Sequence, residues 1–153
     1  MTMTFVLVVL FLAVVIRNSD PTGMFWMVAW PGTVIHEGCH WLVGTILQAK
    51  PTKFHVLPNE TEHNVVLGYV HFDNLTWWNT LPTAMAPLLA LPVAYYMAPQ
   101  FGPLSWTWMG VFKIWVLASI VASAVPSKGD IAAAFGQPKG LVLWGTLAFL
   151  ILK

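Results

Sequence analysis

Long apolar runs separated by short polar segments dominate the sequence. The runs cover residues 5–16, 24–47, 81–99, 103–125 and 141–152. About 20 apolar residues in a helix are enough to cross a bilayer. The pattern therefore predicts an all-α membrane bundle of about four to five transmembrane helices, of which the last run is short for a full span. The first run lacks a preceding basic segment, so we expect a retained span and not a signal peptide.

Residues 48–80 form the long polar stretch of the chain. Two segments in it, 53–57 and 65–72, are rich in β-branched and aromatic residues, and the turn-like segment 58–64 separates them. This pattern predicts a β-hairpin, which would lie at the membrane surface between the second and third spans. Because no repeat or linker divides the sequence, we expect a single integral-membrane domain over residues 1–153.

The composition agrees with a multi-pass protein that has the lipid bilayer as its main partner. Of the 153 residues, 58% are hydrophobic and only 8% are charged, which is far from the balance of an ordinary soluble domain. The formal net charge is +1, so nothing indicates a nucleic-acid partner. The single cysteine, Cys39, excludes a disulfide within the chain.

The segment His36-Glu37-Gly38-Cys39-His40 lies inside the second apolar run, where an ionisable side chain is costly. On a helix, His36 and His40 lie one turn apart on the same face, so both imidazoles can bind one metal ion. Glu37 can then reach a water molecule on that metal. Two histidine ligands and a general base are the arrangement of zinc peptidases. The alternative is a pair of histidines that only pack between helices.

A catalytic zinc ion usually has three protein ligands and one open position. The acidic residues of the chain are Asp20, Glu37, Glu60, Glu62, Asp73 and Asp130. Asp130 is the one that is both distant from the histidines and placed where an apolar run breaks, so we predict that it is the third ligand. A competing interpretation is that Asp130 only caps a helix beginning near Ile131. The third ligand would then be His71, Asp73 or Cys39.

This combination resembles the site-2 protease family of intramembrane zinc metalloproteases. In that family a membrane-associated hairpin follows the H-E-x-x-H helix, and a later span carries an aspartate ligand in an N-x-x-P-x-x-x-D-G-like motif. The corresponding residues here are Ser123, Pro126 and Asp130, with serine in place of asparagine and Ile131 in place of glycine. The resemblance covers residues 24–135.

The resemblance implies a zinc-dependent endopeptidase that hydrolyses peptide bonds in or near the transmembrane segments of a membrane-protein or peptide substrate. His36, His40 and Asp130 would bind Zn²⁺, and Glu37 would be the general base. The hairpin would hold an unwound substrate by strand addition.

Two other functions are consistent with the same fold. A catalytically inactive membrane scaffold has no reason to keep Glu37. A metal-binding transporter would carry polar ligands on several spans, whereas the first and third spans carry no charged residue.

Overall fold

The structure is a computed structural model, and it describes residues 3–19, 26–60, 65–101 and 105–153. The described chain is mostly helical. Its α-helices are α1 (Met3–Asn18), α2 (Trp26–Ile46), α3 (Thr80–Ala84), α4 (Ala90–Met97), α5 (Trp108–Ser123), α6 (Lys128–Phe135) and α7 (Pro138–Leu152). Two 3₁₀ segments, η2 (Ala86–Leu89) and η3 (Ala98–Phe101), flank α4. The strands are β1 (Pro51–His55), β2 (Asn59–Glu60), β3 (Val65–Val66) and β4 (Tyr69–Phe72).

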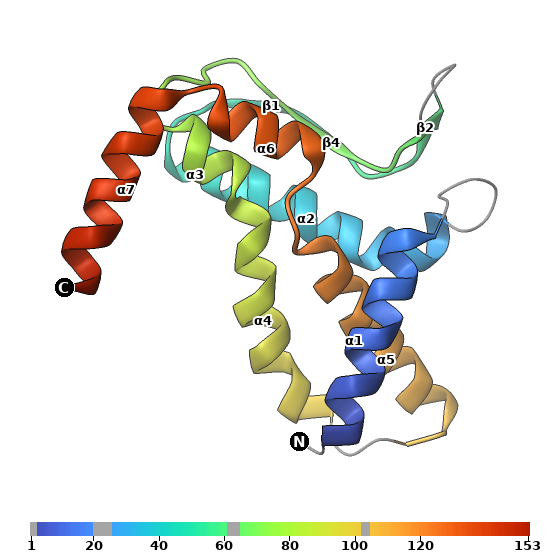
Figure 1. The fold of residues 1–153 in the computed structure, drawn as a ribbon. Helices are drawn as coiled ribbons and strands as arrows, with labels where there is room; N and C mark the ends of the chain where they lie inside the picture. The colour runs from blue at the N-terminus through green and yellow to red at the C-terminus, as the bar shows by residue number, and fades with distance from the viewer. Residues whose placement is uncertain (1–2, 20–25, 61–64, 102–104) are drawn as a thin grey trace.

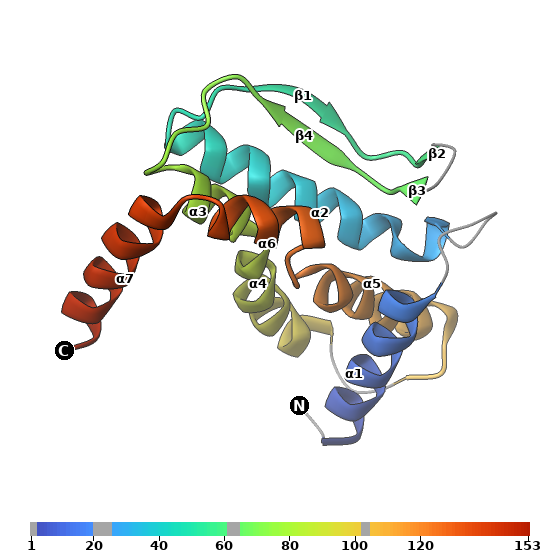
Figure 2. The same cartoon turned by 45° about the horizontal axis from the view of Figure 1, so that its top comes forward.

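The helix α2 runs across one end of α1, α4 and α7, and these three helices all extend to the same side of it (Figures 1 and 2). The strands lie on the other side of α2, and α6 lies beside it near the strands. The segment that carries the H-E-x-x-H residues is therefore covered by strands on one side and by helices on the other.

The strands form one irregular antiparallel hairpin. β1 pairs with β4 in the register Lys53↔His71 and His55↔Tyr69, and β2 pairs with β3. The predicted hairpin is thus confirmed. The prediction of a turn is wrong at Asn59 and Glu60, because backbone pairing with β3 holds these residues in a strand despite the turn preference of asparagine. Residues 61–64 of the expected turn lie outside the described residues.

Helix α2 packs closely on α5 around a proline. Pro31 lies inside α2, where it interrupts the regular backbone hydrogen bonding. The Gly32 N–H donates to Ser119 Oγ at 2.8 Å, and the Val28 carbonyl accepts from Trp115 Nε1 at 2.8 Å. A Cβ at Gly32 would collide with the Ser119 carbonyl oxygen. Side chains of α5 therefore bond to the backbone of α2 next to its proline, and the two helices are held against each other.

The apolar core lies where α1, α4 and α5 meet. Its helices contribute small side chains at a spacing of four residues, as at Ala90, Ala94 and Ala98, and these allow close packing. Larger side chains of the same cluster come from α1 and α5. They include Phe5, Val9, Ile114, Leu117 and Ile120.

One helical stretch among the described residues, Trp108–Phe135, is long and apolar enough to cross a membrane by length and composition. It contains α5 and α6. Helices α1 and α7 are apolar but shorter. The expected four to five spans are therefore not confirmed. The expected third span is divided into α3, η2, α4 and η3, consistent with its prolines. In α2, the polar residues of the H-E-x-x-H segment lower the mean hydropathy of the helix.

Candidate metal centre

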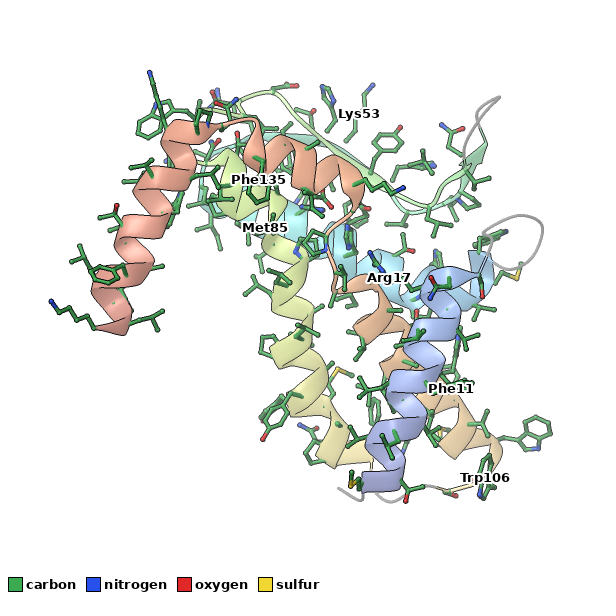
Figure 3. The ribbon with its side chains drawn as sticks, viewed as in Figure 1. Phe11, Arg17, Lys53, Met85, Trp106 and Phe135 are labelled. Atoms are coloured by element: carbon green, nitrogen blue, oxygen red, sulfur yellow. The ribbon has the colours of Figure 1, made fainter. Side chains whose placement is uncertain are left out.

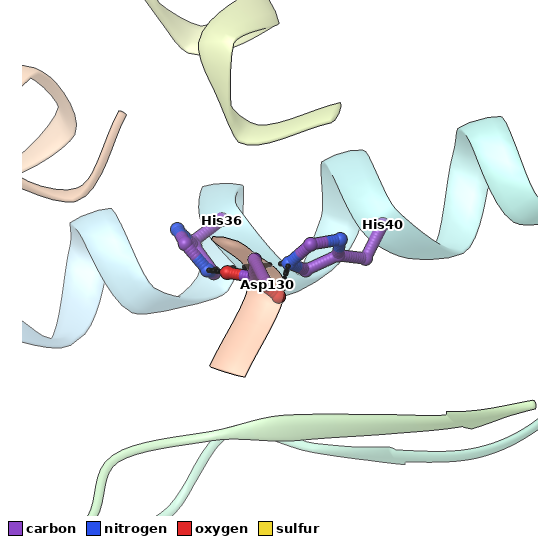
Figure 4. A group of neighbouring side chains, drawn as sticks. All are labelled: His36, His40 and Asp130. Atoms are coloured by element: carbon purple, nitrogen blue, oxygen red, sulfur yellow. Dashed lines mark hydrogen bonds and ion pairs between the residues drawn. The ribbon is translucent and has the colours of Figure 1, made fainter. Parts of the chain in front are cut away.

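His36 and His40 lie one turn apart on the same face of α2, as their spacing predicts (Figure 4). Their ring centroids are 4.9 Å apart, and their Nε2 atoms approach to 3.3 Å. His40 is only 6% exposed. Two imidazole edges thus meet at one point that is largely closed to solvent.

Backbone carbonyl groups orient both rings. His36 Nδ1 lies 2.6 Å from the Ser123 carbonyl oxygen at the end of α5, and His40 Nδ1 lies 2.8 Å from the Thr83 carbonyl oxygen in α3. A carbonyl oxygen can only accept a hydrogen bond, so each Nδ1 carries the proton. In the neutral rings both Nε2 atoms then present lone pairs toward each other. Metal-binding histidines are commonly fixed in this way.

Asp130 reaches the two histidines from the first turn of α6. Its Oδ1 lies 3.2 Å from His40 Nε2, and its Oδ2 lies 3.4 Å from His36 Nε2. The same carboxylate caps α6, because Oδ2 accepts from the Ser127 N–H at 2.7 Å while Ser127 Oγ accepts from the Asp130 N–H. The two interpretations of Asp130 as cap and as metal-facing carboxylate are therefore compatible, and the capping box holds the carboxylate in place.

The donor atoms of these three residues lie close enough together to contact one metal ion. The two Nε2 atoms are 3.3 Å apart, and each lies near a different oxygen of the Asp130 carboxylate. With one ligand atom taken from each residue, the three atoms lie within 4.8 Å of one another. Two imidazole lone pairs and a carboxylate this close together repel one another unless a proton or a metal cation lies between them. His36, His40 and Asp130 therefore form a group that can hold a metal ion.

Glu37 lies beside this group and is 6% exposed. The chain between β3 and β4 passes directly over it at Gly68. A Cβ added to Gly68 would lie 2.9 Å from Glu37 Cγ and 2.9 Å from Thr33 Cγ2, closer than real Cβ atoms approach. Gly68 is not predicted from its motif as part of the site, although a glycine within a strand pattern can indicate such a close approach.

The group faces a cavity of about 1070 Å³ that also contains Glu37. On the hairpin side, residues of β3, β4 and the chain between them line this cavity, while β1 and β2 contribute none of its described lining. Residues of α2, α3 and α5, the start of α6 and the end of α1 line the rest of the cavity. Arg17, at the end of α1, donates from Nη1 to the Ala122 carbonyl near the end of α5 at 3.2 Å, and Figure 3 shows it directed toward that region.

The other candidates for a third ligand lie elsewhere. His71 and Asp73 contact each other on the exposed hairpin, with 3.6 Å between His71 Nε2 and Asp73 Oδ1. Cys39 is half-buried and free. In the part of the chain that the structure describes, His36, His40 and Asp130 are the one group of three such side chains with converging donor atoms.

Comparison with known proteins adds no family to this description. No protein-family model, curated protein or solved structure matches the chain. The resemblance to site-2 proteases therefore depends on the motif residues alone, and the function is argued from the geometry of the site.

Proposed function

We propose that the protein is a zinc-dependent endopeptidase that hydrolyses peptide bonds in or near transmembrane segments. The observation that carries this proposal is the convergence of the donor atoms of His36, His40 and Asp130, with Glu37 next to them in the same cavity. Two histidines, one carboxylate and a neighbouring glutamate are the residues that metal-assisted peptide hydrolysis requires. A carboxylate ligand also lowers the net charge that must be buried with a divalent cation.

The chain's own residues account for the proton transfers of hydrolysis. A zinc ion, when bound, would polarise the substrate carbonyl and a water molecule. Glu37 accepts a proton as the water oxygen attacks the carbonyl carbon, and it returns a proton to the amine as the C–N bond breaks. The Ser123 and Thr83 carbonyls keep His36 and His40 oriented throughout. Burial of Glu37 limits competing contact with bulk water.

The hairpin is suited to hold an extended substrate. β4 is paired with β1 on one side, and the β3–β4 segment borders the cavity that contains Glu37. A peptide that adds to this segment as a further strand would pass close to Glu37 and the metal-binding group. A transmembrane helix has to unwind before it can be cleaved, and strand addition would supply new partners for its backbone.

Exposed apolar side chains support a multi-pass membrane protein. Helices α1, α4, α5 and α7 extend to one side of α2, and their outer surfaces are apolar. Phe11 and Trp106, for example, point away from the bundle in Figure 3. Lipid would cover these surfaces, and α2, which lies across the helix ends, would hold the cavity near one face of the bilayer.

The test combines zinc content with cleavage of a peptide of about 20 apolar residues in detergent micelles. We expect the wild-type protein to bind zinc and cleave this peptide, and Glu37→Gln to bind zinc without efficient cleavage. An inactive scaffold would bind zinc equally in both forms and cleave nothing. Cleavage that is unaffected by Glu37→Gln would contradict the proposed mechanism.

A further inference from the structure

The hydroxyl of Thr83 is buried at the wall of the cavity without a hydrogen-bond partner among the described residues. Thr83 is 2% exposed, and its Oγ1 makes no hydrogen bond within the described structure. The same residue lines the cavity that contains the metal-binding group, and its carbonyl oxygen lies 2.8 Å from His40 Nδ1. An unpaired buried hydroxyl costs free energy, so this position calls for an explanation.

The other serine and threonine hydroxyls that line this cavity all have partners within the described structure. Most bond to the carbonyl group four residues earlier in the chain, as Thr80 Oγ1 does with the Thr76 carbonyl at 2.7 Å. Others link the elements of the site, as Ser119 Oγ does between α5 and α2. These partnered residues are Ser19, Thr33, Thr80, Ser119, Ser123 and Ser127. Thr83 is therefore the member of this set whose hydroxyl lacks a partner within the described structure, at the wall of the cavity.

We propose that the Thr83 hydroxyl donates a hydrogen bond to a backbone carbonyl oxygen of the peptide substrate. This inference rests on the proposed peptidase function and adds a substrate-binding residue to it. The carbonyl groups of an extended strand point alternately to its two sides. Those facing the β3–β4 segment would find partners there. Those on the other side need a donor from the helices, and Thr83 in α3 supplies one beside His40.

The chain offers closely matched variants for a test. Thr83→Val removes the hydroxyl while keeping the shape of the side chain, and Thr83→Ser keeps the hydroxyl. Among the described residues, Thr76 Oγ1 is the other buried side-chain oxygen or nitrogen without a partner, but Thr76 does not line the cavity. Thr76→Val is therefore the control, because it removes a buried, unpartnered hydroxyl that lies away from the cavity.

We would measure zinc content, thermal stability, and kcat and KM for cleavage of the apolar peptide. In the inactive Glu37→Gln background, the Kd of a dye-labelled copy of the peptide gives a readout that is independent of turnover. We expect Thr83→Val to bind zinc normally, keep or gain stability, and lose about 10-fold in kcat/KM and in peptide affinity. Thr83→Ser should restore most of both, and Thr76→Val should change neither.

Three results would overturn the inference, and they are distinguishable. If Thr83→Val cleaves and binds the peptide as the wild type does, Thr83 does not bind substrate, while the peptidase function stands. If zinc-loaded wild type neither cleaves nor binds the peptide, the proposed function fails and the role of Thr83 fails with it. A loss of zinc in Thr83→Val would assign Thr83 to the support of His40 and not to the substrate.

Discussion

The substitution Asp130→Asn separates the two contacts that one carboxylate makes. Asparagine retains an oxygen that can accept from the Ser127 N–H, now 2.7 Å from Oδ2. The helix cap should therefore survive, at a cost of at most about 1 kcal/mol, because a whole cap contributes about that amount. Toward the histidines, the variant loses the negative charge that lies 3.2 and 3.4 Å from the two Nε2 atoms.

The effect on zinc should be much larger than the effect on folding. Loss of an outer partner of a metal ligand weakens metal affinity by about 10- to 100-fold. Because Asp130 would contact the metal directly, we expect at least about 100-fold weaker zinc binding in Asp130→Asn. Cleavage at limiting zinc should fall in parallel.

The assay is competition for zinc against a chelator of known affinity, together with thermal unfolding of the metal-free protein. Ser127→Ala serves as the control, because it removes the hydroxyl half of the capping box and leaves the Asp130 charge in place. If Asp130→Asn and Ser127→Ala weaken zinc equally little, Asp130 acts only as a cap, and our assignment of the third ligand is wrong.

Three further predictions concern the rest of the site. Glu37→Gln should keep zinc and reduce turnover by about 100-fold or more, measured as initial rates at saturating substrate. Near-normal rates would show that Glu37 is not the general base. Gly68→Ala adds a methyl group 2.9 Å from Glu37 Cγ, so the cleavage rate should fall while zinc is retained. The control Gly145→Ala adds a methyl group that meets nothing within 4 Å, so its cleavage rate should not change. Equal cleavage rates for the two variants would contradict the close approach of Gly68 to Glu37. Proline at Val66 or Val70 should impair peptide binding but not zinc binding, because it removes a backbone donor from the β3–β4 segment; full binding by both variants would exclude strand addition.

The local parts of the site could be predicted from the sequence because they depend on helical periodicity. One-turn spacing places His36 and His40 together, and the break before α6 indicated where Asp130 could return to them. The hairpin could also be predicted from local sequence, since β-branched and aromatic residues favour strands. In each case the signal lies within a few neighbouring residues.

The remaining features depend on contacts between distant segments. The approach of Gly68 to Glu37 follows from how the hairpin folds back on α2, and no local pattern specifies it. The carbonyl of Thr83 orients His40 through a backbone atom that every residue type possesses. The course of α2 across the ends of α1 and α4 is likewise set by packing, whereas hydropathy alone predicted only a transmembrane span over residues 24–47.

Zinc content is the most direct test of the central claim that His36 and His40 bind one metal ion. The purified wild-type protein and the His36→Ala, His40→Ala double variant would be loaded with zinc, freed of excess metal, and analysed by elemental mass spectrometry. We predict one zinc ion per wild-type chain and none in the double variant, with both proteins folded. Equal zinc in the two proteins, or none in the loaded wild type, would contradict the account.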